Sequence, residues 1–368
     1  MKTRITACVF IMMVFGMAGP AALAQAEPGG DERQTVLSIT PVFQSWSLGD
    51  ETTMSEFTTV LALSQPIGSS TNVTLRASAA STGGDPARLS GLNDLQIRAT
   101  HSLEAARLVL SLGLNIPTGK TELTVEEFAT SMLLSSPALS WSVPGFGQGF
   151  NAQPGAVWAI PFSENVVGGI GVAYHYKGAF TTIKGYEEFD PGDEIAITGG
   201  MDFQLAEATN LSADVLFTMY GSDKLGSEEV FKAGEKIVVG AQFNKALGQN
   251  ELTILGRYRT RGKGEVGFAR TLVSADEASE PNQVDILGQY SVFINKQLKI
   301  RFGIEGKVQS ETPADLSAAT LFGARVAPEV SLSRTITANP WIRYQTGTVK
   351  GDRSISGIEG GVGLRVVL

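Results

Sequence analysis

Residues 107–116 read RLVLSLGLNI, a stretch that alternates strictly between large apolar and smaller or polar side chains. Successive side chains of a β-strand point to opposite faces, so one face of this stretch is uniformly apolar. The preceding stretch alternates in the same way, with Leu95 and Ile97 on one face and Asp94 and Arg98 on the other. The two stretches predict neighbouring strands that each have one apolar and one polar face.

The same alternation of polarity recurs along the whole chain. The connections between the strands are alternately short turns and longer acidic loops. The short turns are predicted at residues 67–70, 103–106, 162–165, 206–209, 247–250, 295–297 and 335–338. Short turns at one end and long loops at the other are typical of transmembrane β-barrels. A soluble β-sandwich alternates too, but strands of about 10 to 12 residues suit a bilayer better than the usual 5 or 6.

We therefore predict an all-β fold, an antiparallel up-and-down transmembrane barrel that occupies residues 35–368. It has about 16 strands, with 14 as the alternative, short periplasmic turns and long extracellular loops. Two strands are weak in this pattern, at residues 35–48 and 317–334. Pro328 interrupts the second of them and predicts a β-bulge, because proline donates no ladder hydrogen bond.

Residues 1–26 have the pattern of a cleaved secretory signal. Two basic residues precede an apolar run, and overlapping small-x-small sites follow at residues 22–26. The only cysteine of the chain, Cys8, lies inside this segment, so we expect no disulfide and no cysteine metal site afterwards. Residues 27–34 form a short segment before the first strand.

The bulk composition limits the partners. The formal net charge is −8, which disfavours nucleic acid. After the signal no run of about 18 apolar residues exists, yet the chain alternates in polarity, and a barrel in lipid accounts for both. We expect the outer membrane of a Gram-negative bacterium, outer-membrane lipid around the wall, and insertion by the barrel assembly machinery, although the last residue is Leu368 and not an aromatic one.

The third outer connection, residues 117–151, differs from the others in kind. Thr124 and Glu127 form a capping-box pattern that predicts a short amphipathic helix, and an aromatic and glycine-rich stretch follows. This loop either narrows the barrel mouth or covers the rim as a lid. The candidate constriction residues are Phe128, Met132, Leu133, Trp141, Phe146 and Phe150.

Charged side chains on the polar strand faces point to the lumen. They are Arg76, Asp94, Arg98, Lys177, Asp202, Asp214, Arg257, Arg259, Lys299, Arg301, Glu305 and Arg343. Basic side chains therefore outnumber acidic ones in the predicted lumen, whereas the outer loops are acidic. Rings of basic side chains favour anions; the alternative is that these charges pair across neighbouring strands and hold the wall rigid, which several of them are expected to do.

The inventory of reactive residues argues against an enzyme. The two histidines are His101, on an outward face, and His175, an inward residue with no carboxylate partner evident from the sequence. A single lumen histidine is more often a hydrogen-bonded wall residue than a general base. We expect no catalytic residues, no metal and no cofactor.

Two motifs carry a family resemblance. Gly91-Leu92-Asn93-Asp94-Leu95 leads into one strand, and Leu112-Gly113-Leu114-Asn115-Ile116-Pro117-Thr118-Gly119 ends the next. Here the chain resembles the outer-membrane channels associated with degradation of phenol and other aromatic compounds, which are grouped loosely with the long-chain fatty-acid transporters. The resemblance implies passive uptake of small hydrophobic molecules. It also implies an N-terminal hatch for the fatty-acid branch, for which residues 27–34 leave no room.

Two readings of function follow. The first is an outer-membrane channel or transporter for passive uptake of small hydrophobic, aromatic or acidic organic molecules. The alternative is a non-transporting surface or structural barrel whose acidic loops bind a partner.

Overall fold

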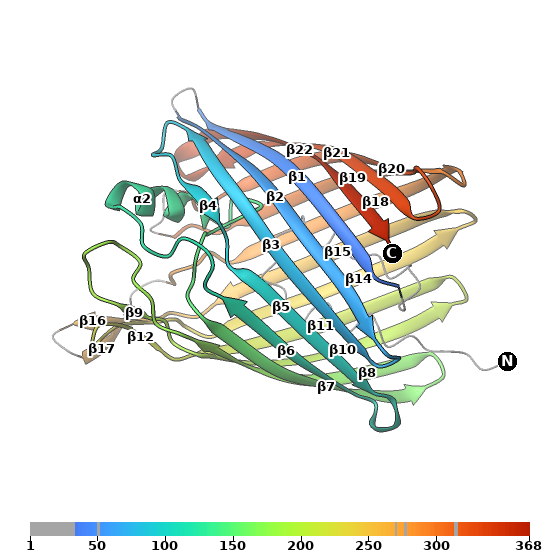
Figure 1. Cartoon of the computed structure of the whole chain (residues 1–368), viewed down its shortest axis with the longest axis horizontal. Helices are drawn as coiled ribbons and strands as arrows, with labels where there is room; N and C mark the ends of the chain where they lie inside the picture. The colour runs from blue at the N-terminus through green and yellow to red at the C-terminus, as the bar shows by residue number, and fades with distance from the viewer. Residues whose placement is uncertain (1–33, 50–51, 269–270, 276–277, 313–315) are drawn as a thin grey trace.

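The computed structural model describes residues 34–49, 52–268, 271–275, 278–312 and 316–368. Sixteen antiparallel strands form a closed barrel in which the first strand pairs with the last (Figure 1). The fold predicted from alternation is confirmed, and the strand count is 16 and not 14. The predicted signal, residues 1–26, lies outside the described residues, as does the segment 27–34 except for Gln34.

The wall runs in chain order, each strand beside its predecessor. Its strands are β1 (Val36–Leu48), β2 (Thr52–Ile67), β3 (Thr71–Gly84), β5 (Leu95–Leu103), β6 (Leu108–Ile116), β7 (Asn151–Ser163), β8 (Val166–Lys177), β10 (Glu194–Ala206), β11 (Thr209–Tyr220), β14 (Lys236–Leu247), β15 (Asn250–Arg261), β18 (Gln283–Asn295), β19 (Leu298–Gln309), β20 (Thr320–Ser331), β21 (Ile336–Val349) and β22 (Arg353–Val367).

Smaller elements lie outside the wall. β4 (Ser90–Leu92) pairs with the end of β3, and a second sheet contains β9 (Phe189–Asp190), β12 (Ser222–Leu225), β13 (Glu228–Lys232), β16 (Glu265–Phe268) and β17 (Thr271–Ser274). The helices are α2 (Val125–Leu134) and two 3₁₀ turns, η2 (Glu104–Ala106) and η3 (Lys350–Asp352). Among the described residues, no helix is long and apolar enough to cross a membrane.

The strands separate apolar from polar side chains as the pleat requires. On β19, Ile304 is 71% exposed on the outer surface, whereas Lys307 is 6% exposed on the inner one. The same split recurs around the barrel, so the outer surface is a belt of exposed aliphatic and aromatic side chains. A continuous apolar belt of this kind is the surface that a barrel presents to lipid.

The two ends of the barrel differ. The C-terminal end of β22 lies at the end with the short turns, and α2 and the second sheet lie at the opposite end (Figure 1). The predicted asymmetry between short and long connections is therefore present. The third outer loop lies at the end of the barrel that carries the long connections.

One predicted turn is displaced. The last short turn spans residues 332–335 and not 335–338, because β20 continues to Ser331 and β21 already begins at Ile336. The Ser333 hydroxyl accepts hydrogen bonds from the backbone N–H groups of Thr335 and Ile336, at 3.2 and 3.0 Å. A serine side chain that bonds the backbone ahead of it closes a turn without glycine or proline.

The bulge predicted at Pro328 is absent. Pairing of β20 with β21 keeps one register on both sides of this proline, from Val326 opposite Ile342 to Val330 opposite Ala338. On its other side Pro328 lies directly opposite Ile300 of β19. The missing N–H therefore opens the ladder locally toward β21 without inserting a residue.

Candidate functional site

The third outer loop begins with the predicted helix, and its N-terminus is capped as the sequence suggested. Thr124 Oγ1 accepts from the Glu127 N–H at 3.2 Å, and Glu127 Oε2 accepts from the Thr124 N–H at 3.1 Å. Lys120 donates to Glu127 Oε1 at 2.5 Å, and this hydrogen bond holds the pKa of Glu127 below its ordinary value. The cap fixes where the loop turns back toward the barrel.

After the helix the chain enters the barrel and packs on its inner wall. Side chains of the loop and of the strands form one buried apolar cluster, with Trp46, Met54, Leu321, Val349 and Ile355 from the wall and Leu134, Ala138, Leu139, Trp141, Val143 and Phe146 from the loop. Burial of this much apolar surface is the main force that holds the loop inside. The loop is thus folded into the mouth and is not a lid over the rim.

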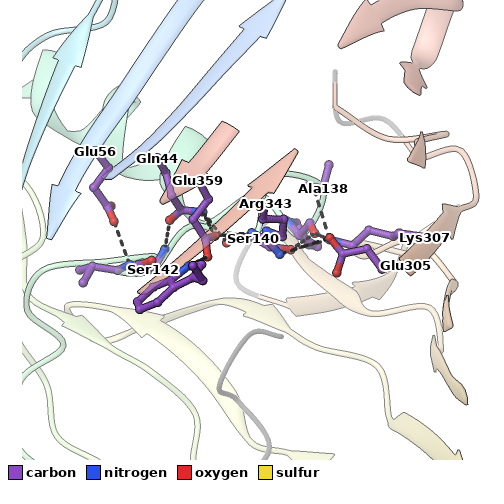
Figure 2. A network of polar contacts seen from close by, with 12 residues as sticks. Gln44, Glu56, Ala138, Ser140, Ser142, Glu305, Lys307, Arg343 and Glu359 are labelled. Atoms are coloured by element: carbon purple, nitrogen blue, oxygen red, sulfur yellow. Dashed lines mark hydrogen bonds and ion pairs between the residues drawn. The ribbon is translucent and has the colours of Figure 1, made fainter. Parts of the chain in front are cut away.

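Polar contacts from the C-terminal strands hold one side of the loop (Figure 2). Lys307 of β19 donates to the carbonyl oxygens of Pro137 at 2.9 Å and Ala138 at 3.2 Å, and also to Ser140 Oγ. Hydrogen bonds from a charged donor are stronger than neutral ones. A single wall lysine therefore binds three acceptors within four residues of the loop.

The N-terminal strands hold the other side. The Ser142 N–H donates to Gln44 Oε1 of β1 at 2.7 Å, and the Val143 N–H donates to Glu56 Oε1 of β2 at 3.2 Å. Gln44 in turn donates through Nε2 to Glu359 of β22 at 2.9 Å. We call Gln44, Glu56 and Lys307 the loop anchor. It binds the backbone of the loop, so it fixes the position of the loop with little regard to side-chain identity.

Asp94 holds the base of the same loop, where the chain leaves and rejoins the wall. Oδ1 accepts from the Gly119 N–H at 2.9 Å, and Oδ2 accepts from Asn115 Nδ2 at 2.7 Å and the Gln148 N–H at 2.8 Å. A Cβ on Gly119 would lie 2.4 Å from the Phe146 carbonyl oxygen, so only glycine fits there. The predicted lumen charge Asp94 is therefore a buried loop clasp, 3% exposed.

The candidate constriction residues separate into two groups. Trp141 and Phe146 are 4% and 2% exposed in the apolar cluster, and Phe128 and Leu133 pack partly against it. Met132 is 62% exposed and Phe150 is 42% exposed. Met132 therefore lies outside the packed cluster, because α2 buries Thr130 and Leu134 instead.

The predicted lumen charges lie on the inner strand faces, and several are paired. Lys177 contacts Glu194 at 2.5 Å, Lys299 contacts Glu251 at 3.9 Å, Arg301 pairs with Glu329, and Arg343 contacts Glu359 at 2.5 Å and Glu305 at 3.6 Å. Arg259 donates to Gln283 at 2.6 Å. Arg76, Asp202, Asp214 and Arg257 are half-buried on the inner faces of β3, β10, β11 and β15, and Arg98 is exposed on the inner face of β5.

His175 has a partner that the sequence did not reveal. Its Nδ1 lies 3.7 Å from Glu194 Oε2, because β10 places Glu194 directly opposite His175 of β8. Lys177 shares the same carboxylate. His175 therefore lies beside the Lys177–Glu194 ion pair on the inner wall.

A second group of lumen residues surrounds Tyr220 of β11. The cations of Arg261, Lys236 and Lys177 lie 4.5, 5.9 and 6.0 Å from the centre of its ring. Arg261 also donates to the Tyr220 hydroxyl at 3.0 Å. Strand parity could have identified Tyr220, since it shares the inner face of β11 with Asp214 and Thr218.

Comparison with known proteins supports the fold. No protein-family model matches the chain, and no curated protein matches it in sequence. Among solved structures, Pseudomonas putida OprB is similar at 9% identity with a TM-score of 0.50, over 92% of this chain and 95% of that one. A monoaromatic hydrocarbon channel, CymD, is 13% identical with a TM-score of 0.48, over 95% and 91%.

A bacterial polysaccharide outer-membrane secretin is 9% identical with a TM-score of 0.49, over 92% of this chain and all of that one. Identities this low speak to architecture alone. The likeness to OprB agrees with the closed antiparallel barrel of 16 strands.

Proposed function

We propose that the protein is an outer-membrane channel for the passive uptake of small organic molecules. The observation that carries the proposal is the third loop, which lies inside a charged lumen and is bound there by strands from both ends of the sequence. A loop fixed in this way narrows the path and leaves the remaining lumen to select solutes. An anchor that served only to hold a surface protein in lipid would have no need of it.

Two features bear on the class of solute. The motifs at residues 91–95 and 112–119 resemble those of channels associated with aromatic degradation, which supports small hydrophobic or aromatic molecules. The excess of arginine and lysine on the inner faces supports acidic molecules. A small aromatic or acidic organic molecule satisfies both.

Deletion of Val125–Leu134 is expected to raise single-channel conductance about twofold or more, because the apolar cluster loses its helical support and the loop withdraws from the mouth. Planar-bilayer recording of the purified barrel measures it. Met132→Ser is the matched control in the same helix, since Met132 is exposed, and it should leave conductance unchanged. Absence of conductance in the wild type and in the deletion would refute the channel and leave the surface-barrel alternative.

We further propose that residues 1–26 are removed as a secretory signal and that the barrel assembly machinery inserts the mature chain. We assign the protein no catalytic role. The chain's two histidines support this, since His101 bonds Thr71 at 2.8 Å on the outer surface and His175 belongs to the pair with Glu194.

A further inference from the structure

Arg325 of β20 carries a positive charge in the lumen and forms no direct ion pair within the described wall. In the ladder it lies between Gly303 of β19 and Arg343 of β21. Among the described residues, no carboxylate lies within ion-pair distance of its guanidinium, and its Nε has no acceptor. A half-buried cation left in this state favours an anion from outside the protein.

The nearby carboxylates are already engaged by other groups. Glu359 accepts from Trp341 Nε1 at 2.9 Å and from Arg343 at 2.5 Å. Glu305 has its closest cation in Arg343, at 3.6 Å, and Glu329 pairs with Arg301. Arg301 and Arg343 are thus engaged with carboxylates, whereas Arg325 has no carboxylate partner among the described residues.

Trp341 supports Arg325 as a flat platform. The guanidinium carbon lies 5.4 Å from the centre of the Trp341 ring. A guanidinium over the face of an aromatic ring gains cation–π attraction and can still offer its planar fork of N–H donors to a carboxylate. The Arg325–Trp341 pair thus places a cation beside an apolar surface.

The platform itself is held in place before any solute arrives. Trp341 lies opposite Gly361 of β22, and a Cβ on Gly361 would lie 2.5 Å from the indole carbons. The indole therefore rests directly on the neighbouring backbone, while its Nε1 is bound to Glu359. Glu359 also accepts from Gln44 of the loop anchor, so the platform is adjacent to the narrowed part of the lumen. Sites of this kind lose little entropy on binding.

We propose that Arg325 and Trp341 form a lumen binding site for the carboxylate group of a small organic acid. The site rests on the proposed channel function and defines the class of solute that the channel binds. Acidic molecules bind in the lumen, whereas neutral molecules pass without binding. The guanidinium binds the carboxylate through its Nη atoms, and the indole edge contacts the organic part of the solute.

Benzoate is a suitable probe, and block of the KCl current in planar bilayers measures its occupancy. Wild-type channels are expected to be blocked by benzoate and not by benzyl alcohol, which lacks the carboxylate. Arg325→Gln should raise the half-blocking benzoate concentration about tenfold or more, since it removes a charge-assisted bidentate contact. Arg325→Lys should give an intermediate value, because lysine keeps the charge but lacks the planar fork.

Arg365→Gln is the matched control. Arg365 is also half-buried on the inner face of β22, four residues beyond Gly361 toward the short-turn end, roughly 13 Å along the strand. Its loss removes the same charge from the lumen, yet it should change the half-blocking concentration by less than about twofold, because salt screens a charge at that distance. Equal weakening by Arg365→Gln and Arg325→Gln would show a general lumen potential and overturn the site.

Titration calorimetry of benzoate on the detergent-solubilised barrel separates this inference from the channel itself. Binding that Arg325→Gln abolishes supports the site even if the wild type conducts nothing, in which case the proposed function alone fails. Binding or block that is unchanged in Arg325→Gln overturns the site even if the wild type conducts. On detergent gels, a difference in mobility between boiled and unboiled samples confirms that each variant is a folded barrel.

Discussion

Replacing Lys307 by methionine is expected to raise single-channel conductance about twofold or more and to make the current noisier. The variant keeps the length of the side chain but removes the donor to Pro137, Ala138 and Ser140. Hydrogen bonds from a charged group contribute about 1.5–3 kcal/mol each, so the loop loses several kcal/mol of its attachment while the gain from not burying an ammonium offsets part. Planar-bilayer recording measures both the mean current and its fluctuation.

Lys299→Met is the control for this experiment. Lys299 is on the same strand and is almost equally buried, but its ion pair is with Glu251 on the wall. This variant should change conductance far less than Lys307→Met does. Equal currents in the two variants would mean that Lys307 does not restrain the loop.

Replacing Asp94 by asparagine is expected to release the third loop at its base. An amide of the same shape has one acceptor oxygen in place of two, so it cannot accept from Gly119, Asn115 and Gln148 together. Leaving buried donors unsatisfied costs about 1–3 kcal/mol each, and the loop should open locally more than tenfold as often. Limited trypsin digestion in detergent measures this, because Lys120 is the one basic residue within 117–151.

The expected product is a pair of fragments cut after residue 120, formed at least tenfold faster than in the wild type. Asp202→Asn provides the comparison, since Asp202 is an inner-face carboxylate near the short-turn end of β10, opposite Ser212, and the loop leaves the barrel wall at the other end. Cutting at the wild-type rate in Asp94→Asn would contradict the role of Asp94 as a clasp.

The wall of this barrel is predictable from sequence because one physical rule governs it. A strand between lipid and water must alternate, and the parity of Leu108 to Ile116 or of Leu298 to Val308 shows the alternation directly. The rule weakens where a side chain replaces the usual turn signal. Ser333 closes its turn through its hydroxyl, so the sequence suggested a turn three residues too late.

Parity identifies which side chains face the lumen, but it does not identify their partners. Asp94 and Lys307 both fall on inner faces, yet both bind the backbone of the third loop, whose course depends on tertiary packing. The helix of that loop was predictable from its capping box, whereas its packed face was not. The spacing of apolar residues alone suggested that Met132 faces the barrel, but the wall contacts α2 on the side of Leu134.

Arg325 escaped sequence analysis for a related reason. The strand that contains it is interrupted by Pro328 and carries the small residues Gly323, Ala324 and Ala327 around the arginine, so its polarity pattern is weak. Only the pairing with β19 and β21 shows which face the arginine occupies. Arg325 is of interest because it has no carboxylate partner among the described residues, and this depends on the side chains of three neighbouring strands together.

The attachments of the third loop also impose an order on assembly. Gln44 and Glu56 belong to the first two strands, Lys307 to a strand near the end, and Gln44 bonds Glu359 across the seam where the sheet closes. Gln44 and Glu56 stand on the same closed wall as Lys307 only once β1 has paired with β22. The loop anchor is therefore complete only in the closed barrel, and an open sheet could hold the loop on one side at most.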